Sequence, residues 1–188
     1  MKRRIFATAA ALAAVVFLIL PAQAAPRTSA QCAILMDADT GSVLFEQNAD
    51  ERSLIASTTK IMTALTVLEL CDPDETVTIP AEATGIEGTS IYLTAGEELT
   101  VRELLYGLLL SSGNDAAVAL ALHAGGSVSA FVAEMNERAE ALGLTQTHFE
   151  NPNGLDGERH YSTARDMANL TAKALKNPIF SEIVATKS

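Results

Sequence analysis

The sequence predicts an α/β protein of the α+β type, in which an early β-hairpin is followed by helices. First, 48% of the 188 residues are hydrophobic and 19% are charged, so the chain can bury a core. Second, two short strand-like segments flank a turn-forming stretch near the start of the chain. Third, helix-capping residues and apolar periodicity recur from about residue 56 to residue 175. Together these patterns predict one domain in which helices outweigh strands.

Residues 1–24 have the pattern of a secretory signal peptide. Basic residues at positions 2–4 precede an apolar run at 5–20, and a small-x-small cleavage site follows at 22–24. The alternative is an uncleaved anchor helix, but the apolar run is shorter than the roughly 20 residues that span a bilayer. We therefore expect an exported, extracytoplasmic protein, in the periplasm or at the cell surface or cell wall.

The charge and the spacing of potential metal ligands argue against two classes of function. With 13 basic and 23 acidic residues, the formal net charge is −10, which disfavours nucleic acid as a partner. The three histidines lie far apart and neither cysteine has a spacing typical of metal ligands, so no metal site and no cofactor are expected. Cys32 and Cys71 are either a disulfide pair or two buried free thiols, and we favour the free thiols.

The hairpin and the first helix follow directly from residue patterns. Strands are expected at Cys32–Asp37 and Ser42–Gln47, because the intervening stretch Ala38–Gly41 has the chemistry of a hairpin turn. A helix is expected from about Ala56 to Leu70. Its apolar residues cover most of its circumference, which is typical of a helix buried on all sides. We expect this helix to form the centre of the core.

The segment that follows is expected to be irregular. Asp72–Ala95 is rich in Thr, Gly and Pro, with short strand-like pieces at Val77–Ile79 and Ser90–Leu93. A capping box at Thr100–Glu103 then predicts the start of a helix that ends near Leu110.

Three more helices are expected in the second half of the chain, at about 114–126, 129–142 and 163–175. The dense turn signal of Asn151–Gly154 separates the second of these from the third. A capping box at Thr163–Asp166 predicts the start of the last helix, and Asn177-Pro178 is expected to end it.

The first candidate for chemistry is Ser57-Thr58-Thr59-Lys60, at the start of the buried helix. Residues at positions i and i+3 share a helix face, so the Ser57 hydroxyl and the Lys60 amine can come within hydrogen-bonding distance. A serine hydroxyl needs a neighbouring base to become a good nucleophile. Burial would lower the pKa of Lys60 and allow it to act as that base.

The second candidate is Ser112-Gly113-Asn114, which interrupts two apolar helices with small polar residues. A loop between helices can direct a hydroxyl and an amide into a cleft. The same triplet is also typical of an ordinary capping turn, and from the triplet alone we favour the capping turn.

In this order the two motifs resemble the SxxK and Ser-x-Asn motifs of penicillin-binding proteins and β-lactamases. The chain is similar to the serine D-alanyl-D-alanine carboxypeptidases, the low-molecular-mass penicillin-binding proteins. The resemblance covers the chain from about residue 28 to its last residue. The stretches that carry it are Ala33–Gly41, Ile55–Leu65, Leu110–Ala117, Phe149–Leu155 and His160–Ala168.

The resemblance implies a reaction and assigns roles to four residues. Ser57 would be the acylated nucleophile, with its backbone N–H forming half of the oxyanion hole, and Lys60 would be its general base. Ser112 would relay a proton to the leaving amine, and Asn114 would hold the substrate amide and orient Lys60. The implied substrate is the peptidoglycan stem pentapeptide, which would lose its terminal D-Ala, and β-lactams would acylate the same serine as covalent inhibitors. The last two similar stretches, with His160, are expected to be structural loops and caps.

The resemblance also implies a β-lactamase/transpeptidase-like fold of three layers, in which helices flank an antiparallel sheet of about five strands. The third family motif, Lys-Thr-Gly, does not occur after Ser112, and only the first hairpin of the sheet is evident. We therefore expect residues 25–188 to be the N-terminal part of a transpeptidase-like catalytic domain, whose remaining strands would follow residue 188. The sequence does not decide membrane attachment.

Two alternatives stay open for the function. A serine β-lactamase would need a Glu-x-x-x-Asn loop, and none lies between Gly143 and Arg165. A catalytically silent remnant that binds penicillin or wall peptides would be consistent with the absence of the third motif.

Overall fold

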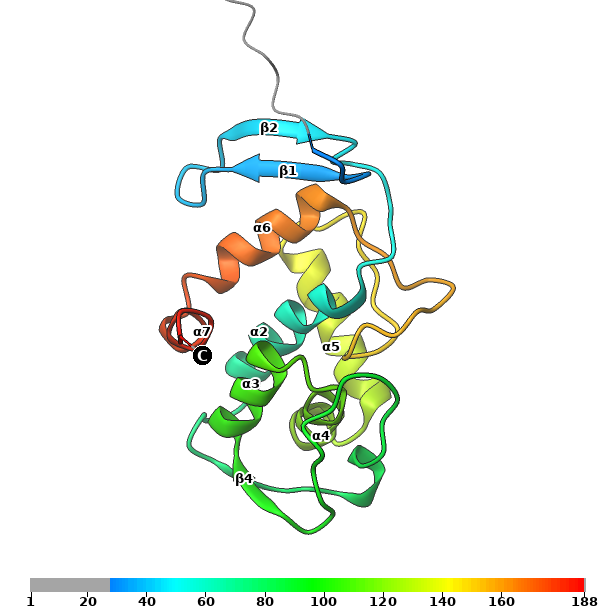
Figure 1. The fold of residues 1–188 in the computed structure, drawn as a ribbon, viewed down its shortest axis with the longest axis vertical. Helices are drawn as coiled ribbons and strands as arrows, with labels where there is room; N and C mark the ends of the chain where they lie inside the picture. The colour runs from blue at the N-terminus through cyan, green and yellow to red at the C-terminus, as the bar shows by residue number, and fades with distance from the viewer. Residues whose placement is uncertain (1–27, 188) are drawn as a thin grey trace, which may run out of the picture.

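A computed structural model describes residues 28–187 (Figure 1). The predicted signal peptide at 1–24 lies outside the described residues. The fold is a β-hairpin placed over a group of helices, with the first long helix in the middle of the group (Figure 1). The prediction of one early hairpin and a helix-rich remainder is confirmed.

The hairpin consists of the antiparallel strands β1 (Ala33–Met36) and β2 (Val43–Gln47). In its turn, the Asp37 carboxylate accepts hydrogen bonds from the backbone N–H and the hydroxyl of Thr40, at 2.8 and 2.7 Å. These local bonds stabilise the turn without help from the rest of the molecule. The hairpin lies along helix α6 (Ala164–Ala174) (Figure 1).

An ion-pair network attaches the hairpin to that helix. At the start of α6, Arg165 donates to Glu46 of β2 at 2.6 Å and to Asp50 at 2.7 Å. Hydrogen bonds from Arg165 lower the pKa of the Asp50 carboxyl. The network therefore fixes the orientation of the hairpin relative to α6.

The central helix begins as a 3₁₀ turn, η1 (Ala56–Thr59), and continues as α2 (Lys60–Leu70). It packs against all four of the helices α3 (Val101–Leu110), α4 (Asn114–Gly125), α5 (Val128–Ala141) and α6. The large side chains that fill the space between these helices are fully buried: Met62, Leu104, Leu105, Leu108, Leu120, Phe131, Met135 and Leu170. The buried position predicted from its all-round apolar pattern is confirmed.

A second small sheet forms in and just after the segment that the sequence predicted to be irregular, and its first strand overlaps the strand-like piece predicted at Val77–Ile79. Strand β3 (Thr76–Thr78) pairs antiparallel with β4 (Glu98–Thr100), which leads directly into α3, and the short 3₁₀ turn η2 (Ala81–Ala83) follows β3. The predicted capping box at the start of α3 is confirmed, because Thr100 and Glu103 exchange both of its hydrogen bonds.

The predicted strand at Ser90–Leu93 is wrong. This segment forms no strand: Tyr92 within it has a left-handed φ of +62°, and its polar groups bond to the buried Asp115 carboxylate of α4 rather than to a neighbouring strand. Asp115 accepts from the Ser90 hydroxyl at 2.6 Å, from Ile91 N at 3.1 Å and from Leu93 N at 3.0 Å. One side chain thus replaces a sheet partner, which a strand pattern cannot reveal.

The end of the chain also differs from the prediction. Helix α6 ends before Asn177-Pro178, as predicted, but it is not the last helix, because the same two residues begin another one, α7 (Pro178–Val184). The Asn177 side chain accepts from Ile179 N and Phe180 N, and proline is well suited to the first helical position. At Thr163, the N-cap bond to Asp166 N is present, but the Asp166 carboxylate bonds to Gln146 N and Thr147 instead of completing the capping box.

No single helix within residues 28–187 is both long and apolar enough to cross a membrane, and α4 and α5 pass that test only as a pair bent by 86°.

The network around Asp115 should contribute strongly to stability. Replacing the carboxylate by an amide (Asp115→Asn) puts an N–H group next to N–H donors, so we expect a loss of about 3 kcal/mol in the free energy of unfolding, measured by urea denaturation. Asp74→Asn is the matched control, since the Asp74 side chain is 80% exposed in its pair with Arg102. It should cost less than about 1 kcal/mol.

The same carboxylate should give stability a characteristic pH dependence. Burial alone would raise the pKa of Asp115, but the hydrogen bonds from Ser90, Leu93, Ile91 and Ala116 lower it overall. Its contribution is therefore complete above the unfolded-state value of about 3.9 and is lost as the pH falls below it. Equal slopes of stability against pH in the wild type and in Asp115→Asn would contradict this assignment.

Candidate active site

The structure brings together the two residues of the first motif. Ser57 lies in η1 with its side chain exposed, and Lys60 is the first residue of α2. The Lys60 Nζ atom lies 3.1 Å from the Ser57 Oγ atom, as the i, i+3 spacing predicted. The hydroxyl is therefore accessible to a ligand while the amine behind it is not.

Lys60 is buried, and no carboxylate within residues 28–187 forms an ion pair with it. Its side chain is held by three oxygens: Ser57 Oγ, Asn114 Oδ1 at 2.7 Å and the backbone carbonyl of Asn153 at 2.6 Å. The residue is only 2% exposed. Burial lowers the pKa of Lys60 to about 8, since none of its three acceptors carries a full negative charge that would favour the ammonium form.

The hydrogen bonds around Lys60 determine which part of its neutral amine faces the Ser57 hydroxyl. A neutral amine has two N–H donors and one lone pair, whereas an ammonium has three donors. The Asn153 carbonyl can only accept, and the Asn114 side chain is oriented by its Nδ2 group, which donates to the carbonyl of Glu87 at 2.6 Å. Both donors of the neutral amine are therefore taken, and its lone pair faces the Ser57 hydroxyl.

The second motif lies at the same site. Asn114 begins α4, and Ser112 lies in the preceding turn with a φ of +57°, a left-handed conformation that is uncommon for serine. Ser57, Lys60 and Ser112 line one cleft of about 420 Å³. Its other walls come from α2, α3, α6 and α7 and are largely apolar: Ile61, Leu108, Leu109, Thr171, Leu175, Phe180 and Val184.

Two contributors to the site were not predicted. The turn Asn151–Gly154 was expected to be structural, yet the Asn153 carbonyl is a direct partner of Lys60. Gly154, at a φ of +88°, lies so close to the Ala56–Ser57 peptide that an added Cβ atom would overlap the Ala56 carbonyl. The dense turn signal located this segment, but no residue type indicates which carbonyl of a turn will bind a side chain.

His160 has a structural role in this arrangement. Its ring is buried, accepts a hydrogen bond from Glu150 N at 3.0 Å and faces the Thr59 hydroxyl at 2.7 Å. Because Nδ1 accepts, the Nε2 atom carries the proton and donates to Thr59. Burial lowers the pKa of His160, which favours the neutral ring. It holds the 150–160 segment against the 3₁₀ turn that carries Ser57.

Comparisons with known proteins identify the fold and the family. A solved D-alanyl-D-alanine carboxypeptidase from Mycobacterium tuberculosis matches with a TM-score of 0.84 and 38% identity, over 89% of this chain and 64% of that one. The fold is therefore that of the DD-peptidases. The profile of the D-alanyl-D-alanine carboxypeptidase family matches residues 20–188, and the chain belongs to this family. The fold and the family predicted from the sequence are confirmed.

Curated relatives show how much of a longer protein the chain represents. The D-alanyl-D-alanine carboxypeptidase DacF of Bacillus subtilis is 43% identical over 162 residues, covering 84% of this chain and 42% of that protein. DacC of Escherichia coli is 42% identical over 174 residues, covering 87% of this chain and 43% of that protein. The chain thus spans less than half the length of these two relatives.

The close approach of Gly154 to the nucleophile turn can be tested by its effect on stability. Gly154→Ala should lower the free energy of unfolding by about 3 kcal/mol or more, because the new methyl group adds overlap with Ala56 to the cost of a left-handed alanine. Gly143→Ala is the matched control: its φ is +72° and nothing lies within 4 Å of the added atom. It should cost only about 1–2 kcal/mol by denaturation. Equal losses in the two variants would show that the contact is unimportant.

Proposed function

We propose that this chain carries the nucleophile and the general base of a serine-type D-alanyl-D-alanine carboxypeptidase that acts on peptidoglycan stem peptides. The observation that supports this most directly is the buried Lys60 amine, hydrogen-bonded at 3.1 Å to the exposed Ser57 hydroxyl. The names of the relatives supply the substrate class.

In the proposed acylation step, the neutral Lys60 amine takes the proton of Ser57 as Oγ attacks the carbonyl carbon of the D-Ala-D-Ala peptide bond. The C–N bond then breaks, and the departing D-Ala amine receives a proton. Ser112, which lines the same cleft, is suited to pass that proton from Lys60 to the leaving group. The product is an ester between Ser57 and the shortened peptide.

In the proposed deacylation step, water attacks the ester carbonyl and Ser57 regains its proton. The oxyanion that forms in both steps needs N–H donors, and the Ser57 backbone N–H makes no backbone hydrogen bond within residues 28–187. Asn114 would hold the substrate amide while its Oδ1 atom orients Lys60. β-Lactams contain a reactive cyclic amide and would acylate the same Ser57.

Covalent labelling tests the assigned roles. The purified protein should form a stable adduct with a fluorescent penicillin, detected on a denaturing gel and placed on Ser57 by mass spectrometry. Ser57→Ala should abolish the adduct, and Lys60→Met should slow its formation by about 10²–10⁴-fold because the general base is lost. Ser111→Ala is the control, since Ser111 is the exposed C-cap of α3 next to Ser112. It should label like the wild type.

Penicillin binding and two assays of hydrolysis separate the proposed function from its alternatives. Reversible binding of penicillin without an adduct, unchanged by Ser57→Ala, would favour a silent binding protein. Rapid hydrolysis of a chromogenic cephalosporin would favour a β-lactamase. Release of D-Ala from a synthetic peptide ending in D-Ala-D-Ala, lost in Ser57→Ala, is the result expected for the carboxypeptidase.

The rate of labelling should rise with pH. With the pKa of Lys60 at about 8, the neutral, basic amine makes up about a tenth of the population at pH 7 and about nine-tenths at pH 9. We expect the acylation rate to increase by about tenfold between these values, after correction for hydrolysis of the free penicillin. A rate that is flat, or that rises only near the ordinary lysine value of 10.5, would contradict Lys60 as the base.

The protein is further proposed to be exported. The support is the basic start, apolar run and small-x-small site of residues 1–24. Protein recovered from the extracytoplasmic fraction should have the mass of a chain that begins at Ala25. Recovery of the uncut chain in the cytoplasm alone would contradict export.

A further inference from the structure

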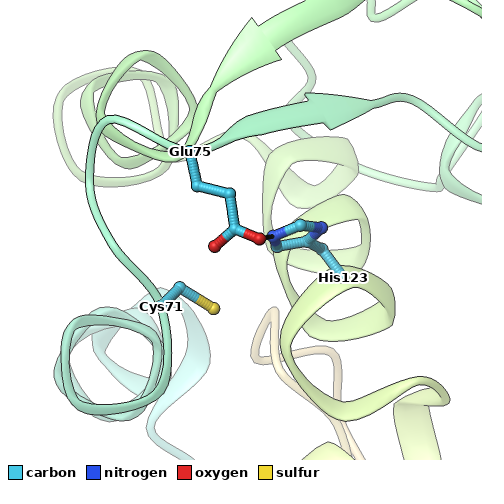
Figure 2. Close-up of side chains that lie close together, drawn as sticks. All are labelled: Cys71, Glu75 and His123. Atoms are coloured by element: carbon cyan, nitrogen blue, oxygen red, sulfur yellow. Dashed lines mark ion pairs between the residues drawn. The ribbon is translucent and has the colours of Figure 1, made fainter.

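Three potential metal ligands converge at the far end of the two helices that carry the candidate active site. Figure 2 shows Cys71, Glu75 and His123 with their side chains directed toward one another. Their ligand atoms all lie within 4.8 Å of one another, and His123 Nε2 is 3.4 Å from the Glu75 carboxylate. This cluster is not evident from the sequence, because His123 is far from the other two residues along the chain.

Each ligand comes from a different element with a fixed backbone. Cys71 is the C-cap of α2, and its N–H donates to the carbonyl of Val67 at 2.9 Å. Glu75 lies in the turn after it, where its carbonyl accepts from Val101 N at 2.9 Å. His123 belongs to the last turn of α4. Only small side-chain rotations are therefore needed to bring three ligand atoms around one ion.

The electrostatic field at the cluster favours a cation. Two helices end there, and the C-terminal end of a helix carries a partial negative charge. Within residues 28–187, the ion pair that Glu75 makes is the one with His123, so no lysine or arginine competes for the carboxylate.

We propose that Cys71, Glu75 and His123 form a Zn²⁺ site. Sulfur, imidazole nitrogen and carboxylate oxygen together suit Zn²⁺, whereas Mg²⁺ and Ca²⁺ prefer oxygen ligands alone. Three protein ligands leave the fourth tetrahedral position to water. On binding, the thiol proton of Cys71 passes to solvent and a Zn–S bond forms.

The ion would join the ends of α2 and α4 opposite the active site. Lys60 begins α2 and Asn114 begins α4, and their side chains are hydrogen-bonded at 2.7 Å. The eleven residues of α2 place Cys71 about 16 Å from Lys60. A bound ion would therefore link the two helices at one end while the Lys60–Asn114 bond links them at the other.

Cobalt substitution tests the site without reference to enzyme activity. Co²⁺ titrated into the purified, metal-free protein should give the visible bands of tetrahedral cobalt and a near-ultraviolet thiolate band, saturating at one ion per chain. Zn²⁺ should displace it and remove the colour. Cys71→Ser should abolish the thiolate band and weaken binding by at least about a hundredfold. Cys32→Ser, which removes the other free cysteine, is the matched control and should leave the spectrum unchanged.

Further variants keep the test decisive if Cys71→Ser disturbs the fold. Glu75 is 49% exposed, so Glu75→Gln should fold normally and bind Co²⁺ about tenfold more weakly, and His123→Gln should shift the visible bands. Zn²⁺ should raise the thermal unfolding midpoint of the wild type and Cys32→Ser but not that of Cys71→Ser. A thiolate band that survives Cys71→Ser, or no binding at micromolar Co²⁺, would overturn the proposal. Penicillin labelling of Ser57 is read separately, so either proposal can fail alone.

Discussion

The structure depends on the burial of one lysine side chain without a countercharge. Lys60 loses the hydration of its amine and receives only neutral oxygen acceptors in return. Such an environment is costly for an ammonium and tolerable for an amine, which is why its pKa falls to about 8. The acceptors come from three separate places in the chain, namely η1, the start of α4 and the turn at Asn153. Much of the fold serves to bring those places together.

The peptide units around the lysine are held in uncommon conformations by the packing around them. Ala56 and Ser112 have positive φ angles, of 45° and 57°, on the two segments that supply the hydroxyls of the cleft. Left-handed conformations cost a non-glycine residue about 1–2 kcal/mol each. The buried apolar contacts of α2 with four other helices offset that cost, while Gly154 permits the turn that carries Asn153 to lie close against the Ala56–Ser57 peptide.

Sequence reasoning located the parts of the site that depend on residue type and on local spacing. The Ser57–Lys60 contact follows from helical geometry, and the family resemblance placed Asn114 beside Lys60. It did not identify the Asn153 carbonyl, because every residue has a carbonyl and only the tertiary fold selects one. The failure at Ser90–Leu93 has a similar cause, since the bonding partner is the Asp115 side chain of a distant helix. At Asn177-Pro178 the signal correctly marked the end of α6, but the helix that the same proline begins was missed, because proline suits the first position of a helix as well as the region after its end.

Ser57 is a good nucleophile only in the folded chain, because the residues that hold its base, Lys60, lie far from Lys60 in the sequence. Asn114 and Asn153 lie 54 and 93 residues away from Lys60, so both contacts require the closure of long loops. In an unfolded chain with an ordinary lysine, the neutral amine is about one part in three thousand at pH 7, against about one in ten in the folded protein. Ser57 is then an unactivated alcohol. A newly made chain would therefore be chemically inert, and folding itself would serve as its activation step.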